Sequence, residues 1–169
     1  MNALLRLADG IDAFVNAVGK LAVALVLAMV ALVTWNVVSR YFGGGATVAA
    51  QEAEWHLLAF VALIGISVLM QQKGHVRVEF IYDILSPRAK DALDLFSMLV
   101  GVVVSIMIIR YSVGFVGNSF SLLENSPDPG GLPMRYALKA LIPIGFAIFG
   151  AQCLALAIRH AAALSGTER

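Results

Sequence analysis

Long apolar stretches recur along the chain and are separated by short polar segments. Leu21–Val38 contains no charged residue, and a helix of that length is roughly 27 Å long, close to the thickness of the hydrocarbon core of a bilayer. A helix suits such a stretch because it satisfies its own backbone hydrogen bonds where lipid offers no partner. The pattern predicts transmembrane helices at residues 21–39, 54–72, 92–115 and 137–158.

Two further segments are amphipathic and are predicted to contact the membrane surface. Residues 1–19 place apolar side chains at three- and four-residue spacings, which is typical of a helix lying on the membrane. The same pattern also fits a simple extension of the first transmembrane helix into water, and the sequence leaves both interpretations open. Residues 75–86 at first alternate apolar and polar side chains, but a lone strand beside lipid would leave its backbone unpaired. We therefore predict an interfacial helical segment there.

Serine, proline and glycine predict where the helices begin and end. Ser86 followed by Pro87 is typical of an N-cap and a first helical turn, so the third helix is expected to begin there. Residues 117–135 contain the sequence SPDPGGLP, whose prolines and glycines interrupt a helix and favour tight turns. We predict a loop over those residues.

The distribution of positive charge predicts the orientation of the chain. Four transmembrane helices place both termini on one side, together with the segment that joins the second and third helices. Lys and Arg residues are more numerous on that side than around the two opposite loops, and cytoplasmic segments normally carry this excess. We predict an all-α integral membrane protein with interfacial amphipathic helices, both termini in the cytoplasm and residues 117–135 outside. The cytoplasmic interfacial anchor then comprises His75, Arg77, Glu79 and Asp83.

The composition supports a membrane protein and disfavours some other classes. Hydrophobic residues make up 60% of the chain and charged residues only 14%, whereas ordinary soluble domains carry about 25% charged residues. The net charge is +1 and there is no basic tail, so nucleic-acid binding is not expected. Cys153 is the only cysteine, and its position in an apolar stretch indicates a buried side chain rather than a reactive thiol.

Charged residues gather at the outer ends of the first two transmembrane helices. Arg40 ends the first apolar stretch, while Glu52 and Glu54 precede the second. A charge at membrane depth is costly and normally finds a partner, so we predict structural ion pairing among these three residues. A cation or proton site is the alternative interpretation. Arg110 either faces the bundle or, as we expect, extends its side chain to the outer interface.

The sequence contains no catalytic or cofactor-binding pattern. His56 follows Glu52 and Glu54, but their spacing does not place all three on one helical face, so a metal site is not expected. His75 and His160 lie near cytoplasmic helix ends and are expected to be solvated. We find no nucleophile–base pair and no glycine-rich phosphate loop, and we predict neither enzymatic activity nor a cofactor.

Several segments, taken in order, resemble a known family. Arg40-Tyr41-Phe42 is followed by QEAEWHLL, then by KGHVRVEFIYDILSP, and finally by SPDPGGLPMRYALKALIPIGF. This order resembles the small membrane subunit of tripartite ATP-independent periplasmic (TRAP) transporters, the DctQ-like or Q subunit. The resemblance covers nearly the whole chain and is most specific from Asn36 to Phe146. Where this chain has Glu79 the family more often has Asp, so the carboxylate is kept.

The resemblance implies an accessory role in a bacterial inner membrane. Such subunits have four transmembrane helices and bind a large membrane subunit, which carries the substrate and sodium sites and moves its transport domain like an elevator. A periplasmic substrate-binding protein delivers the ligand, usually an organic acid. The expected function is that of a scaffold subunit supporting sodium-coupled, ATP-independent uptake of an organic acid. The periplasmic loop residues expected to help receive the binding protein are Glu124, Ser126, Asp128 and Arg135.

Two other function classes remain open from the sequence. A stand-alone small four-helix transporter would depend on a charged residue within a span, whereas the acids here cluster at the edges of the spans. A membrane enzyme or an electron-carrier anchor would need paired ligands, such as histidines on facing helices. His56, His75 and His160 are predicted at different levels, which disfavours that class.

Overall fold

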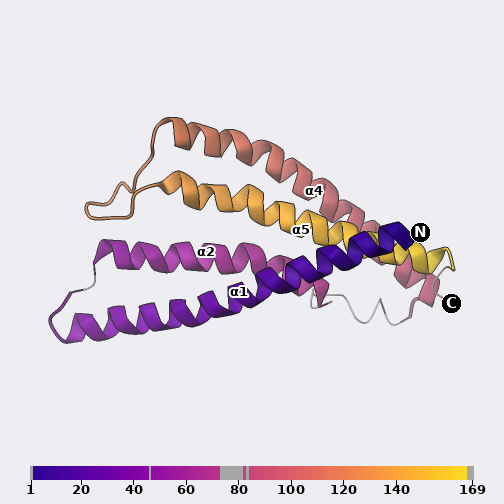
Figure 1. The fold of residues 1–169 in the computed structure, drawn as a ribbon, viewed down its shortest axis with the longest axis horizontal. Helices are drawn as coiled ribbons and strands as arrows, with labels where there is room; N and C mark the ends of the chain where they lie inside the picture. The colour runs from indigo at the N-terminus through magenta and orange to yellow at the C-terminus, as the bar shows by residue number, and fades with distance from the viewer. Residues whose placement is uncertain (1, 46, 73–81, 83, 167–169) are drawn as a thin grey trace.

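The computed structural model describes residues 2–45, 47–72, 82 and 84–166, and this part of the chain forms long helices joined by short connections (Figure 1). The helices are α1 (Asn2–Tyr41), α2 (Val48–Gln71), α4 (Pro87–Ser121) and α5 (Arg135–Leu164). All four are long and apolar enough to cross a membrane. The predicted all-α fold with four transmembrane helices is therefore confirmed. The anchor residues His75, Arg77, Glu79 and Asp83 lie outside the described residues.

The helices form two hairpins, one of α1 with α2 and one of α4 with α5 (Figure 1). Helix α5 lies centrally, because it packs against α4, α2 and α1. We call the end where α1 and α4 finish and α2 and α5 begin the loop end. The opposite end, which holds both termini, is called the terminal end (Figure 1).

Helix α1 is one continuous helix of 40 residues. Residues 1–19 were predicted either to lie on the membrane as an amphipathic helix or to extend the first transmembrane helix, and the structure continues one helix from Asn2 through residues 21–39 without a break. At about 1.5 Å per residue the helix is roughly 60 Å long, about twice the hydrocarbon thickness of a bilayer. A helix of this length must tilt strongly or extend beyond the lipid.

The ends of the helices follow local capping chemistry. The Ser86 hydroxyl accepts a hydrogen bond from the Ala89 N–H at 3.3 Å, which confirms the predicted start of α4. At the start of α2 the Thr47 hydroxyl accepts from the Ala50 N–H at 3.2 Å, so that helix begins at Val48, before residue 54 where we predicted the span to begin. Helix α4 continues to Ser121, beyond residue 117 where we predicted the loop to begin. A glycine in a helix costs only about 1 kcal/mol, so Gly117 does not end it.

Small residues allow the helices to approach closely. A Cβ atom placed on Gly145 of α5 would lie 2.7 Å from the Cβ of Leu63 on α2. A Cβ on Gly101 of α4 would lie 2.8 Å from the Sγ of Cys153 on α5. Cys153 is fully buried in the α4–α5 core, as predicted from its apolar surroundings. Close backbone approach at small residues is how helices pack well in lipid, where apolar burial drives little association.

Much of the apolar surface of the bundle is left uncovered by the chain itself. On α1, Leu27 is 68% exposed, and on α4, Ile106 is 60% exposed. Side chains of this kind are favourable against lipid tails or against another apolar protein surface, and costly in water. The distribution of exposed residues therefore fits a membrane-embedded bundle.

Candidate functional site

Glu52 holds the loop between α4 and α5 against the start of α2. Its side chain is buried, and its carboxylate accepts hydrogen bonds from the Ser126 hydroxyl and, at 2.6 Å, from the Leu132 N–H. A Cβ on Gly131 would lie 2.9 Å from the Glu52 Oε1, so glycine allows the loop to approach this closely. Hydrogen bonds to an ionised carboxylate are stronger than those between neutral groups. The loop is thus fastened to the other hairpin at this point.

Glu124 closes the same loop from the α4–α5 side. Its carboxylate accepts hydrogen bonds from the Lys139 ammonium at 2.5 Å and from the Ser119 hydroxyl at 2.6 Å. Its carbonyl oxygen accepts from the Arg135 N–H at 2.8 Å. The hydrogen bonds from Lys139 and then Ser119 hold the pKa of the Glu124 carboxyl below its ordinary value. This carboxylate joins the end of α4 to the beginning of α5.

The two outer carboxylates that we predicted to pair with Arg40 contact other residues of this chain. Glu54 Oε1 accepts a hydrogen bond from the Nδ2 of Asn36 at 2.5 Å, and Asn36 is buried between α1 and α2. Within the described residues Arg40 forms no ion pair, and its side chain is exposed. An amide and a carboxylate therefore tie the first hairpin here. Asn36 is one of the few polar residues in the first predicted span. A polar residue at such a position is a sign of a helix–helix contact, and it could have identified Asn36 from the sequence.

The residues predicted for docking a partner divide into two groups. Glu124 and Ser126 direct their side chains toward other residues of this chain, as described above. Arg135 is partly buried, and its charge lies near both Glu52 and Glu124. Asp128 is exposed at the tip of the loop. Of this set, Asp128 presents the most accessible charge.

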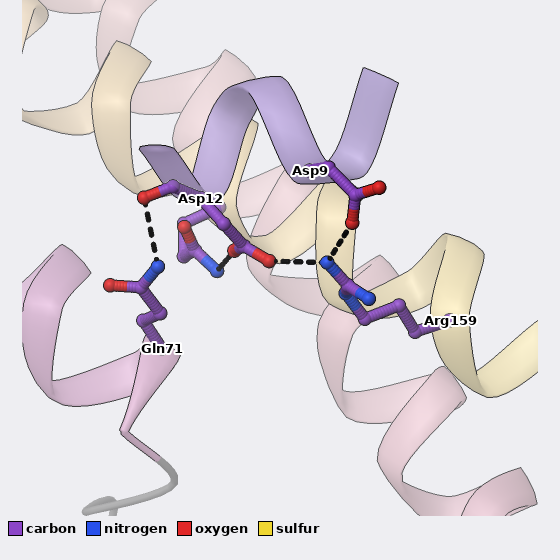
Figure 2. Close-up of polar contacts among 5 residues, drawn as sticks. Asp9, Asp12, Gln71 and Arg159 are labelled. Carbon is purple, nitrogen blue, oxygen red and sulfur yellow. Dashed lines mark hydrogen bonds and ion pairs between the residues drawn. The ribbon is translucent and has the colours of Figure 1, made fainter. Parts of the chain in front are cut away.

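A second polar cluster lies at the terminal end, where we predicted no polar contacts. Figure 2 shows Arg159 of α5 directed toward Asp9 and Asp12 of α1. The Arg159 Nη2 donates to the Asp9 Oδ1 at 2.7 Å and to the Asp12 Oδ2 at 2.6 Å. Gln152 Nε2 donates to the Asp12 Oδ1 at 2.8 Å, and Gln71 Nε2 donates to the Asp12 carbonyl oxygen at 3.0 Å. Asp12 therefore joins α1 to both α2 and α5.

His160 connects α5 to α4 at the same end. Its Nδ1 lies 3.0 Å from the Asp91 Oδ1, and its Nε2 lies 3.8 Å from the Asp94 Oδ2. Asp94 also accepts a hydrogen bond from the Tyr82 hydroxyl at 2.9 Å. Only 15% of the His160 side chain is exposed, so our expectation of a solvated histidine is wrong. Two aspartates one turn apart on α4 supply its partners.

These contacts link helices to one another and to a loop. His56, which follows the two outer glutamates, places its Nδ1 2.7 Å from the carbonyl oxygen of Glu52, a contact within one helix. In the described ranges no three His, Cys, Asp or Glu side chains are grouped as metal ligands would be. Together these contacts act as structural ties at both ends of an apolar bundle.

Comparison with known proteins places this bundle in a family. The family model of the DctQ component of tripartite ATP-independent periplasmic transporters matches residues 29–163. The chain is also 27% identical over 151 residues to the ectoine TRAP transporter small permease protein TeaB of Halomonas elongata, which covers 89% of this chain and 77% of that protein. The four apolar helices, the family match and the similarity to TeaB all indicate the same kind of membrane subunit. The chain therefore belongs to the DctQ family and is a small permease subunit of the TRAP transporter class.

Proposed function

We propose that this chain is the fixed accessory subunit of a complex that takes up an organic acid by sodium-coupled, ATP-independent symport. In this proposal a large membrane subunit carries the substrate and sodium sites, and a periplasmic substrate-binding protein delivers the ligand. The complex lies in the bacterial inner membrane, with both termini of this chain in the cytoplasm. The chain itself widens and anchors the part of the complex that does not move.

The observation that carries the proposal is that the carboxylates of the helices are bonded to other parts of this chain. Proton- or cation-driven transport by the chain alone would need a carboxylate within the membrane that can exchange its partner. At the loop end, Glu52 is held by the α4–α5 loop and Glu54 by Asn36. At the terminal end, Asp12 is held by Arg159 and Gln152. These carboxylates serve as helix ties, which suits a scaffold better than a carrier.

The rival function is that of a stand-alone four-helix transporter, and reconstitution separates the two. We expect liposomes with this chain alone to show no sodium-dependent accumulation of organic acids or of ectoine. Liposomes that hold this chain with its large subunit, supplied with the binding protein, are expected to accumulate one of these solutes. Uptake by this chain alone would establish the rival function, and uptake by the large subunit alone at the full rate would remove the scaffold role.

The loop between α4 and α5 is proposed as part of the dock for the binding protein. The loop residues Glu124, Ser126, Asp128 and Arg135 were predicted together, and the exposed Asp128 is the most accessible of them. We expect Asp128→Asn to weaken capture of the binding protein by the assembled complex, because the charge at the tip is lost. The control is Glu168→Gln, which removes a charge near the C-terminus. Equal capture by the wild type and by a chain with a neutral linker in place of SPDPGG would exclude this dock.

A further inference from the structure

A groove lies between α1 and α2 at the loop end. Its volume is about 420 Å³. The Asn36–Glu54 contact that ties the two helices forms part of its lining. Its walls combine apolar, aromatic and charged side chains, among them Val33, Val37, Arg40, Tyr41, Glu54 and Trp55. Such a combination is typical of a site for an amphiphilic molecule rather than for a purely apolar one.

Two opposite charges line this groove without pairing to each other. Arg40 follows Asn36 by one turn on α1, so both residues lie on the side of α1 that faces α2. One carboxylate oxygen of Glu54 accepts a hydrogen bond from Asn36. Within the described part of the chain the other oxygen accepts none. Since a charge at the membrane edge normally has a partner, an external group that offers both signs would satisfy Arg40 and Glu54 together.

The aromatic side chains place the charged part of the groove at the level of lipid headgroups. Tyr41 is 85% exposed and Trp55 is 62% exposed, and both residue types are enriched at the membrane interface. Val33 and Val37 extend the same groove from Arg40 toward the apolar centre of α1. A ligand with a charged head and an apolar tail could therefore place each part against a matching wall.

We propose that this groove binds a zwitterionic phospholipid of the phosphatidylethanolamine class. The Arg40 guanidinium would bind the phosphate, because its planar donors match phosphate oxygens. The Glu54 carboxylate would accept hydrogen bonds from the primary ammonium. The acyl chains would run along Val33 and Val37. This inference concerns the lipid around the chain and does not depend on the transported substrate.

Lipid titration of the full chain tests the proposal. The chain in mild detergent is titrated with phosphatidylethanolamine, phosphatidylglycerol or phosphatidylcholine, and bound lipid is counted by native mass spectrometry. We expect preferential binding of phosphatidylethanolamine by about tenfold, because both other lipids lack the hydrogen-bonding ammonium. Equal binding of the three lipids would overturn the proposal, and would be the result if the groove instead receives a side chain of a partner protein.

Three variants assign the selectivity to named residues. Glu54→Gln is expected to make phosphatidylethanolamine and phosphatidylglycerol bind equally, while its amide oxygen can still accept from Asn36. Arg40→Gln is expected to reduce binding of both lipids about tenfold. Arg110→Gln is the matched control, because Arg110 is an exposed arginine on α4, outside the groove.

The control also decides whether the site is real. If Arg40→Gln and Arg110→Gln reduce binding alike, the effect is one of general charge and the proposal fails. Circular dichroism checks that each variant keeps its helices. If Arg40→Gln loses helical structure, Arg40→Lys replaces it. That variant keeps the charge but loses the planar donors, and wild-type affinity for phosphatidylethanolamine in Arg40→Lys would then contradict the assignment of the phosphate to the guanidinium.

Discussion

The Arg159 Nη2 lies 2.6 Å from the Asp12 Oδ2, although the two residues are 147 positions apart in the sequence. This contact joins the first helix to the last at the terminal end. At the loop end, Glu52 of α2 is bonded to Leu132, 80 positions further on. The two hairpins are therefore tied to each other at both ends, and the apolar spans between these ties pack through small residues.

Removal of the Arg159 charge is expected to destabilise the bundle. Arg159→Gln leaves Asp12 and Asp9 without their cationic partner, and we expect a loss of roughly 1–3 kcal/mol, typical of hydrogen bonds to charged groups. The measurement is the midpoint of thermal unfolding in detergent. Arg6→Gln is the control, because Arg6 is an exposed arginine on the same helix as the aspartates. A double-mutant cycle with Asp12→Asn should give a clear coupling energy, and additive effects would contradict the tie.

A methyl group added at Gly145 is expected to separate α5 from α2. Its Cβ would lie 2.7 Å from the Leu63 Cβ, and overpacking of this kind typically costs about 1–3 kcal/mol. Gly65→Ala on α2 is the control, since nothing lies within 4 Å of a Cβ at that position. The control should be neutral or slightly stabilising, because alanine favours helix by about 1 kcal/mol over glycine. Thermal unfolding of the two variants compares them directly, and equal midpoints would argue against the close helix contact.

Acidification is expected to loosen the loop through Glu124. Its pKa is lowered in the folded protein by the hydrogen bonds from Lys139 and Ser119, so the folded state binds this proton less tightly than the unfolded chain does. The stabilisation is fully present above the ordinary pKa of 4.5 and is lost as the pH falls through the lowered value. Amide exchange of the loop between pH 6 and pH 3 measures the change.

Two variants isolate the Glu124 contribution to that pH dependence. In Glu124→Gln the loop should be loose at every pH, and the part of the pH response due to this group should disappear. Asp128→Asn removes an exposed carboxylate of the same loop and should leave the response unchanged. A response of wild-type size in Glu124→Gln would show that another group controls the loop.

Neutralisation of Glu52 is expected to detach the loop from α2. Glu52→Gln removes the charge and leaves one acceptor oxygen where the carboxylate offers two to Ser126 and the Leu132 N–H, so both charge-assisted hydrogen bonds are weakened or lost. We expect faster amide exchange and faster proteolytic cleavage near Leu132, while the α4–α5 core around Met98 stays protected. Glu54→Gln is the matched control, because its contact is with Asn36. If the loop of Glu52→Gln is as protected as that of the wild type, Glu52 does not fasten it.

The sequence predicted the elements of this fold better than their contacts. Apolar stretches and the Ser86-Pro87 pair predicted four spans and the start of α4, because helix formation in lipid depends on local composition and capping. The partners of Glu52 and Asp12 depend on which helices pack together, which local patterns do not record. Arg40 was predicted to pair because of its charge, but the neutral Asn36 lies in the buried position facing Glu54.

Polar residues inside apolar stretches were the neglected signal. Gln152 and Asn36 each interrupt a span and each hydrogen-bonds a carboxylate on a neighbouring helix. A polar side chain is costly in lipid unless it is paired, so such residues indicate helix–helix contacts even when their partners are unknown. The same reasoning applied to Asp9 and Asp12 would have predicted a cationic partner at the terminal end.

Co-purification of the tagged full chain tests the scaffold role most directly. The chain is expressed in its native host with a C-terminal tag, extracted in mild detergent, and its companions are identified and quantified by mass spectrometry. We predict a large membrane protein with many transmembrane helices in about equal amount, absent from a tag-only control. Recovery of the chain alone, or only with further copies of itself, under conditions that preserve other membrane complexes of the host would contradict the account.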